Sequence, residues 1–487
     1  MDCRSAVYCD LDSLCLLDRK HLLSMGSVIA GNGLLRISYE SVGGFNLKNR
    51  VMWIRLLSLA WPVIMENFLQ STAGFVDSLF ISKLGLTEVA AVGVTNAILQ
   101  IYFALFMSIS TATTVFVSRA IGENDEEKVR NIVSQSVLLS VLMGLLLGAV
   151  SLFFARPILS LMGANQEVLQ VGVRYFQIVA VPSVVISLLF TIGAILRGSG
   201  DTKTPLRIGL WMNIVHIILD YILIIGVFFH GFGIEGAAAA TVLARLIGVS
   251  LLSRHLHKSG LLFRSIRKWS TIHGELFQKL VLLGVPAALE RLFMRTGQLI
   301  YFGMIIRMGT KEYAAHTLTG NFTMFSTIVG TGLAVATTTL IGQSLGAGRT
   351  DEVKSYSKWA MIISSAVMSI TLLFVWGTSF WATHFFTTDQ FVIHLMITVL
   401  LIDVIAQPAT GMVTALTAIL QAGGDTKFPM YVTWLGIWGV RTVGVYVLGI
   451  SLGWGLIGAW IAIALDNYIR AAILFSRYRS FKWLKKI

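Results

Sequence analysis

Charged residues are scarce in this sequence. Of its 487 residues only 13 % are charged, whereas 55 % are apolar; a soluble domain usually carries about 25 % charged residues. This composition excludes a soluble globular enzyme, a disordered chain and a fibrous repeat. It predicts an all-α protein that crosses the membrane many times. Because the apolar segments are continuous runs without period-two alternation, the pattern argues against a transmembrane β-barrel.

Cysteine and nucleotide-binding motifs are also missing from most of the chain. Cys3, Cys9 and Cys15 are the three cysteines, and their spacing matches no metal site. We expect no metal beyond the coupling ion, no cofactor, and neither a disulfide nor a cysteine nucleophile in the spanning region. The sequence has no G-x-x-x-x-G-K-[ST] phosphate loop, so an ion gradient is the expected source of energy.

The basic net charge of +13 does not indicate nucleic acid, because no basic helix is interleaved with stacking aromatics. Lysine and arginine instead concentrate in alternate loops, in the connection 255–276 and in the basic tail 478–487. The opposite loops hold little beyond Lys83, Arg156 and Lys311. By the positive-inside rule we expect a multi-pass protein of the cytoplasmic (inner or plasma) membrane with both termini in the cytoplasm.

Residues 1–50 differ from the rest, since they mix short apolar pieces with charges and glycines. The run 25–30 is too short to span, and no signal-peptide cleavage site follows a charged start. We interpret the segment as a disordered extension or as the result of a wrongly assigned start, with Met25 and Met52 as alternatives. Its removal is expected to leave transport intact.

Twelve apolar segments from Met52 onward are long enough to cross a bilayer, which takes about 20 residues. The predicted spans are 53–82, 88–115, 131–155, 168–196, 205–229, 234–253, 277–307, 313–341, 357–384, 391–420, 429–450 and 455–477.

The chain repeats itself at an almost constant offset. The run Gly200-Asp-Thr-Lys-Thr-Pro205 recurs 224 residues later as Gly424-Asp-Thr-Lys-Phe-Pro429, and the same offset pairs Pro62 with Pro286. Each half holds six predicted spans, and an even number gives both halves the same orientation. We therefore predict an N-terminal lobe, 51–254, and a C-terminal lobe, 277–477, which form a parallel repeat.

Several motifs resemble the multidrug and toxic-compound extrusion (MATE) family. They are Gly74-Phe-Val-Asp77, the glycine turns Gly122-Glu-Asn-Asp125 and Leu345-Gly-Ala-Gly348, and the doubled Gly-Asp-Thr-Lys loop. The resemblance implies twelve helices in two six-helix lobes around a V-shaped central cavity. It also implies export of lipophilic, often cationic compounds in antiport with H⁺ or Na⁺. Within the family, we expect the chain to belong to the DNA-damage-inducible-type branch.

Asp77 is the leading candidate for cation coupling, because ionisable groups inside spans are costly and usually functional. It follows Pro62 by fifteen residues, and proline lets the helix bend as a hinge. A carboxylate in a low-dielectric lobe can bind a proton near neutral pH, or Na⁺ where oxygen ligands gather. The resemblance implies the same role for Asp77; the alternative is a solvated carboxylate at the interface.

The fifth span carries Asn213, His216 and Asp220. Residues four apart share a helix face, so His216 and Asp220 are predicted to interact and to form, with Asp77 and Asn213, a cation cluster that could hold Na⁺ at Asp77 and Asp220. The family resemblance places an asparagine where this chain has His216. Imidazole suits an alkali ion poorly, whereas it titrates near neutral pH, so the substitution favours protons.

The second half carries a different set of polar residues. Glu290 stands one turn after Pro286, the second predicted hinge, and either belongs to the coupling pathway or is an interfacial acid. Tyr301 replaces the aspartate expected at the position that repeats Asp77, which predicts asymmetric coupling. Arg441 is the most deeply placed base and is expected to pair with a carbonyl or an acid.

The sequence therefore predicts a secondary active multidrug exporter and not an enzyme, with small drug-like molecules and the lipid bilayer as its partners and a monomeric state. The main alternative is a flippase for lipid-linked precursors. An intramembrane prenyl transferase would need clustered aspartate pairs for a metal–diphosphate site, and we find none in the sequence.

Overall fold

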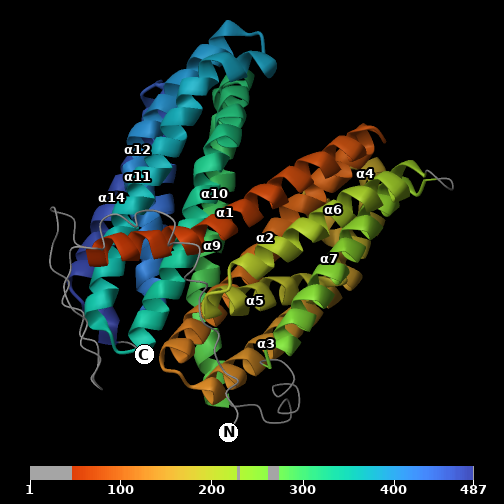
Figure 1. Ribbon diagram of the computed structural model, residues 1–487. Coiled ribbons are helices and arrows are strands. Elements are labelled where there is room, and N and C mark those ends of the chain that lie inside the picture. Colours follow the sequence, from red (N-terminus) through yellow and green to blue (C-terminus); the bar gives the residue numbers. More distant parts are fainter. Residues whose placement is uncertain (1–46, 227–230, 261–273, 486–487) are drawn as a thin grey trace, which may run out of the picture. The chain divides into compact units, whose positions relative to one another are not determined.

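The computed structural model describes residues 47–226, 231–260 and 274–485, and all regular structure in these ranges is helical (Figure 1). The predicted extension before residue 47, with its three cysteines, and the linker residues 261–273 lie outside them. The helices of the first half are α1 (Leu47–Ser82), α2 (Leu86–Gly122), α3 (Glu126–Leu161), α4 (Gln166–Ala180), α5 (Ser183–Ser199), α6 (Lys203–Ile225) and α7 (Gly233–Lys258). Those of the second half are α9 (Gly274–Met308), α10 (Thr310–Gly346), α11 (Thr350–Ala382), η1 (Thr383–Phe385), α12 (Gln390–Ala422), α13 (Lys427–Trp434), η2 (Leu435–Thr442), η3 (Val445–Ser451), α14 (Gly455–Arg479) and η4 (Lys482–Lys485).

The helices confirm an all-α, multi-pass membrane fold. Within the described ranges, nine helical segments are long and apolar enough to cross a bilayer, and the bent pair α4–α5 makes a tenth. The first and seventh predicted spans correspond to α1 and α9, of 36 and 35 residues. These two helices fall outside that set, since polar residues such as Gln70 and Arg291 interrupt their apolar runs.

Some predicted spans are not regular helices, and the third has non-helical backbone angles at Phe154. The fourth is bent by 43° between α4 and α5, where Pro182 lacks the N–H that would continue the helix. The eleventh begins as α13 and continues as the π-helices η2 and η3. In η2 the Thr442 hydroxyl donates to the carbonyl of Ile437, five residues earlier, at 2.8 Å. Segments of π-helix are rare and often occur at functional sites.

The first helix of each half contributes to cores on both sides of the repeat. Leu56 of α1 packs with Leu333 and other residues of the second half, whereas Ile81 packs with the first half. Likewise Leu280 of α9 lies in a cluster of the first half, and Ile305 lies in one of the second. Figure 1 shows α1 passing from the blue and cyan helices to the orange and yellow ones. Both helices therefore link the helix bundle of the first half to the helix bundle of the second half.

The ends of α2 and α10 meet through glycines at repeat-related positions. Gly122 lies against the carbonyl of Gln343, and Gly346 lies against the carbonyl of Arg119. A side chain at either glycine would overlap this backbone, so the close approach requires glycine. Arg119 also donates to the carbonyl of Ala422 at 3.3 Å. The end of α12, just before the second Gly-Asp-Thr-Lys loop, therefore meets the same junction.

Candidate functional site

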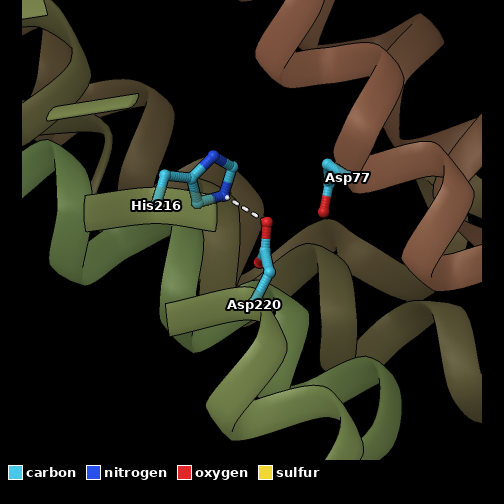
Figure 2. Close-up of side chains that lie close together, drawn as sticks. All are labelled: Asp77, His216 and Asp220. Carbon is cyan, nitrogen blue, oxygen red and sulfur yellow. Dashed lines mark ion pairs between the residues drawn. The ribbon is translucent and has the colours of Figure 1, made fainter. Parts of the chain in front are cut away.

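Asp77, His216 and Asp220 lie together among the helices of the first half (Figure 2). Their ligand atoms are all within 4.8 Å of one another. Asp77 comes from the second half of α1, and the other two occupy adjacent turns of α6. The Nε2 atom of His216 lies 3.5 Å from Oδ2 of Asp220 and hydrogen-bonds with the Thr241 hydroxyl at 3.1 Å. The predicted contact between His216 and Asp220 is thus present.

The carboxylates of this cluster have few partners. The side chain of Asp220 is fully buried. Neither of its oxygens has a hydrogen-bond partner among the described residues, and the same holds for Oδ1 of Asp77. A buried carboxylate without partners is costly to keep charged. The cluster is therefore suited to take up a proton or a cation.

Two further residues, Arg245 and Tyr175, interact electrostatically with the cluster, and neither was identified from the sequence. Arg245 of α7 interacts electrostatically with Asp77 and Tyr175, and Tyr175 of α4 also interacts with Asp220. The signal for Arg245 is present in the sequence, because it is the one charged residue well inside the predicted span 234–253. A fixed positive charge beside the carboxylates disfavours a second permanent cation there.

A second feature is a central cavity of about 790 Å³. Its lining comes from both halves of the repeat and includes Gln100 and Thr111 of α2 as well as Arg295 of α9. Asn213, Glu290 and Tyr301 also line it. Asp77, His216 and Asp220 are not among the described residues that do. The structure thus separates the acidic cluster from the cavity, and it places Asn213 on the cavity wall.

The two repeat-related glutamates have different partners. Glu66 forms an ion pair with Arg197 of α5 at 3.2 Å. Glu290 is buried and accepts hydrogen bonds from the Gln421 amide at 3.0 Å and the Thr433 hydroxyl at 3.4 Å. Both of its oxygens are therefore engaged, which distinguishes it from Asp77 and Asp220. The nearby prolines, Pro62 and Pro286, lie inside the helices α1 and α9, and their role as hinges stays a prediction.

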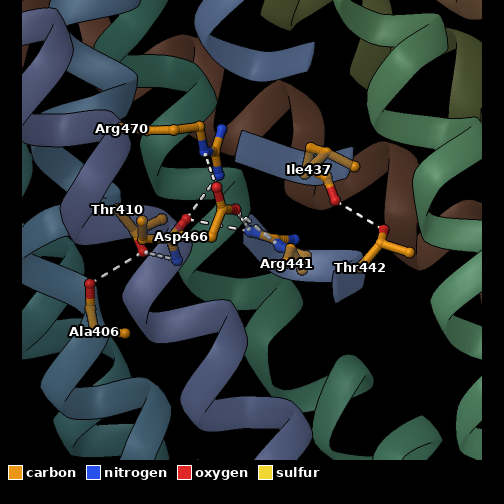
Figure 3. Close-up of polar contacts among 8 residues, drawn as sticks. Ala406, Thr410, Ile437, Arg441, Thr442, Asp466 and Arg470 are labelled. Carbon is orange, nitrogen blue, oxygen red and sulfur yellow. Dashed lines mark hydrogen bonds and ion pairs between the residues drawn. The ribbon is translucent and has the colours of Figure 1, made fainter. Parts of the chain in front are cut away.

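Arg441 lies in a buried polar network (Figure 3). Its guanidinium contacts the carboxylate of Asp466 at 2.7 Å, and Arg470 bonds the other oxygen of that carboxylate at 3.0 Å. Asn467 accepts from both arginines and donates to Thr410 at 3.0 Å. The expected partner of Arg441 is confirmed as an acid. Its guanidinium also lies 5.9 Å from the ring centre of the tyrosine at position 301.

Comparisons with known proteins show the family and the fold of the chain. The MatE family pattern matches residues 62–222 and 286–447. An uncharacterised transporter of Bacillus subtilis, YisQ, is 31 % identical over 438 residues, which cover 88 % of this chain and 95 % of the relative. A probable multidrug resistance protein, NorM of Thermotoga maritima, is 28 % identical over 444 residues, which cover 88 % and 93 %. A crystal structure of a variant of the Vibrio cholerae MATE transporter VcmN matches with a TM-score of 0.84 and 20 % identity over 91 % of this chain and all of that one.

Proposed function

This chain belongs to the MatE family of membrane transporters, which are not enzymes, and we propose that it exports lipophilic, drug-like molecules in exchange for protons. The observation that carries the proposal is the arrangement of two separate sites. One is a cavity large enough for a drug-like molecule. The other is a cluster of poorly partnered carboxylates in the first half.

Separate sites permit coupling through conformation. Uptake of a proton by Asp77 or Asp220 removes a buried charge whose oxygens have few hydrogen bonds among the described residues. Such a change can shift the balance between two arrangements of the first bundle if the two arrangements solvate the carboxylates differently. Because α1 packs with both bundles, a change at Asp77 can reach the walls of the cavity.

We favour the proton over Na⁺ because of the groups that face the cluster. His216 replaces an oxygen donor with imidazole, which is a poor ligand for an alkali ion. Arg245 adds a fixed positive charge. Na⁺ at Asp77 and Asp220 is the alternative that the experiment below tests.

The distribution of basic residues supports the orientation of the chain. The Gly-Asp-Thr-Lys loops, the start of α11 and the end of α14 are rich in lysine and arginine, so we propose that they face the cytoplasm of an inner or plasma membrane. In a variant without Cys3, Cys9 and Cys15, a cysteine introduced as Ser480→Cys should resist an impermeant maleimide in intact cells. One introduced as Ala164→Cys should react. Placement in the DNA-damage-inducible-type branch and a monomeric state stay predictions.

Transport into proteoliposomes tests the proposal. The purified chain is reconstituted, and a lipophilic cation, a lipophilic anion and a neutral compound are offered under a proton gradient or a Na⁺ gradient imposed separately. We expect transport of at least one compound under the proton gradient alone. Transport that responds only to Na⁺ would contradict proton coupling, and absence of transport under both gradients would contradict the proposed function.

Asp77→Asn identifies the coupling residue, because asparagine keeps the shape of the side chain but cannot bind the proton. We expect normal expression, retained substrate binding and at least about 100-fold slower gradient-driven transport, in line with loss of an essential proton carrier. The matched control is Asp389→Asn, because Asp389, at the start of α12, forms a solvent-accessible ion pair with Lys311 of α10. Wild-type transport rates in Asp77→Asn would show that Asp77 is not the coupling group.

A further inference from the structure

Resting on the proposed transport function, we propose that the central cavity binds lipophilic organic anions, with the acid group held by Arg291 and Arg295. This substrate class differs from the cations that the family resemblance implies. The proposal depends on the charges that line the cavity, on their partners and on the apolar surface beside them.

Arginines outnumber acids on the cavity wall. The described lining residues include five arginines and three acids, and they are Arg197, Arg291, Arg295, Arg441 and Arg470 with Glu66, Glu290 and Asp403. Arginine keeps its charge at any pH at which the protein is folded. The wall therefore carries an excess of positive charge even if every one of these acids is ionised.

Three of the five arginines bond carboxylates directly. Arg197 pairs with Glu66 at 3.2 Å, and Arg441 and Arg470 share Asp466. For Arg291 and Arg295, the described part of the chain provides no carboxylate within ion-pair distance. These two guanidiniums are thus the ones available to an acid group of a bound molecule.

Both guanidiniums are held in place by neutral oxygens. Arg291 and Arg295 are four residues apart, so they share one face of α9. Arg291 donates to the hydroxyl of Thr111 at 3.1 Å, and Arg295 donates to the side-chain carbonyl of Gln100 at 3.4 Å. Neutral acceptors orient the groups without cancelling their charge. Each guanidinium has five N–H donors, and Nε of Arg291 has no partner among the described residues.

Apolar side chains adjoin this pair. Between Gln100 and Thr111, α2 presents Phe103 and Met107 to the cavity, and α9 presents Met294 beside Arg295. Flexible methionines and an aromatic ring adapt to apolar bodies of different shape. Charge-assisted bonds from two guanidiniums suit a carboxylate or sulfonate. The combination fits an anion with a large apolar body.

Nearby acids do not remove the preference of the cavity for anions. Glu290 precedes Arg291 in the chain and interacts with it electrostatically. However, its two oxygens accept from Gln421 and Thr433. We therefore expect Arg295 to contribute more to anion binding than Arg291. A lipophilic cation at the same place would face two positive charges, which disfavours it.

Binding measurements without a gradient test the assignment. The full-length chain is placed in nanodiscs of neutral phosphatidylcholine and titrated with 4-(1-pyrenyl)butanoate or with the matched 4-(1-pyrenyl)butylammonium. Energy transfer from the 12 tryptophans to pyrene reports binding, after subtraction of empty nanodiscs. We expect the butanoate to bind at least about tenfold more tightly, since only it forms charge-assisted bonds with the arginine pair. Equal or tighter binding of the ammonium would overturn the proposal.

Variants assign the preference to the two arginines. Arg295→Gln should abolish most of the preference and Arg291→Gln a smaller part, whereas Arg295→Lys should retain more of it than Arg295→Gln. Arg174→Gln is the matched control, because it removes the same charge from an exposed pair with Glu235; it should bind as the wild type does. Unchanged selectivity in a folded Arg295→Gln protein would contradict the assignment.

One further arm separates small molecules from lipid headgroups. Phosphatidylglycerol added to the nanodiscs should leave the bound butanoate in place, and its displacement would assign the site to a lipid. None of these readouts requires a gradient. Loss of coupling would therefore contradict the proposed function while leaving the binding result intact.

Discussion

The two halves of the repeat use buried charge in opposite ways. In the first half, Asp77 and Asp220 place carboxylate oxygens in the protein interior with almost no partners. In the second half, Asp466 is equally buried, yet two arginines bond its oxygens. Protonation of the first site removes a charge that has almost no hydrogen bonds, whereas loss of the Asp466 charge in the second half breaks two ion pairs. From this difference we expect a responsive first half, which changes when a proton binds, and a fixed second half.

The difference begins in the sequence. The position that repeats Asp77 is Tyr301, whose ring faces Arg441 and so supports the fixed network. The positions that repeat His216 and Asp220 are Val440 and Gly444, which cannot titrate. No ionisable cluster like that of the first half can therefore form at the repeat-related place.

The largest expected effect comes from breaking the fixed network. Asp466→Asn leaves Arg441 and Arg470 buried without their shared acid. Removing one partner from a buried ion pair typically costs about 3–5 kcal/mol. We expect much lower expression and a clearly lower midpoint of thermal unfolding in detergent, measured by the loss of monodisperse protein on heating.

The control for this prediction is the same substitution at an exposed acid. Asp389, which caps α12, pairs with Lys311 of α10 at 2.7 Å, and such solvent-accessible pairs contribute at most about 1 kcal/mol. Asp389→Asn should therefore unfold within a few degrees of the wild type. Equal thermal stability of Asp466→Asn and Asp389→Asn would show that the ion pairs of Asp466 do not stabilise the second half.

The responsive half should show the reverse pattern. Asp220→Asn removes a buried charge that lacks hydrogen-bond partners, so we expect stability equal to or above that of the wild type. Transport driven by the proton gradient should fall at least about tenfold, because the cluster loses one proton acceptor. Measuring both the unfolding midpoint and the transport rate on one preparation separates this outcome from misfolding. A strongly destabilised Asp220→Asn protein would contradict the comparison.

Glu290 is expected to show an effect between those of Asp466 and Asp220. It belongs to the second half, but it lines the cavity. Glu290→Gln keeps the side chain's size, but one of its oxygens becomes an amide nitrogen that cannot accept from Gln421 or Thr433. A lost buried hydrogen bond costs about 1–3 kcal/mol. We expect a moderate fall in thermal stability and transport that still responds to the proton gradient. Complete loss of the response would place Glu290 in the coupling pathway after all.

The sequence predicted much of this organisation, and its failures have physical reasons. Composition and the repeat predicted the helices and the two halves, and the four-residue spacing of His216 and Asp220 predicted their contact. The π-helices η2 and η3 follow from tertiary packing and have no local signal. The proposed role of Arg291 and Arg295 depends on which acids lie nearby in space, and sequence spacing alone does not give that distance.

The smallest expected effect concerns the choice of ion. His216→Asn introduces an amide oxygen beside Asp220 and removes the imidazole, which bonds the Thr241 hydroxyl at 3.1 Å. Oxygen donors suit Na⁺ better than imidazole does, so the variant should respond more to a Na⁺ gradient than the wild type. The shift is expected to be about two- to tenfold, because Arg245 still opposes a second cation. Proteoliposomes with each gradient imposed alone give the ratio of the two transport rates. His216→Gln is the comparison variant, because its longer amide is displaced from the place of the imidazole; a ratio unchanged in both variants would mean that His216 does not select the ion.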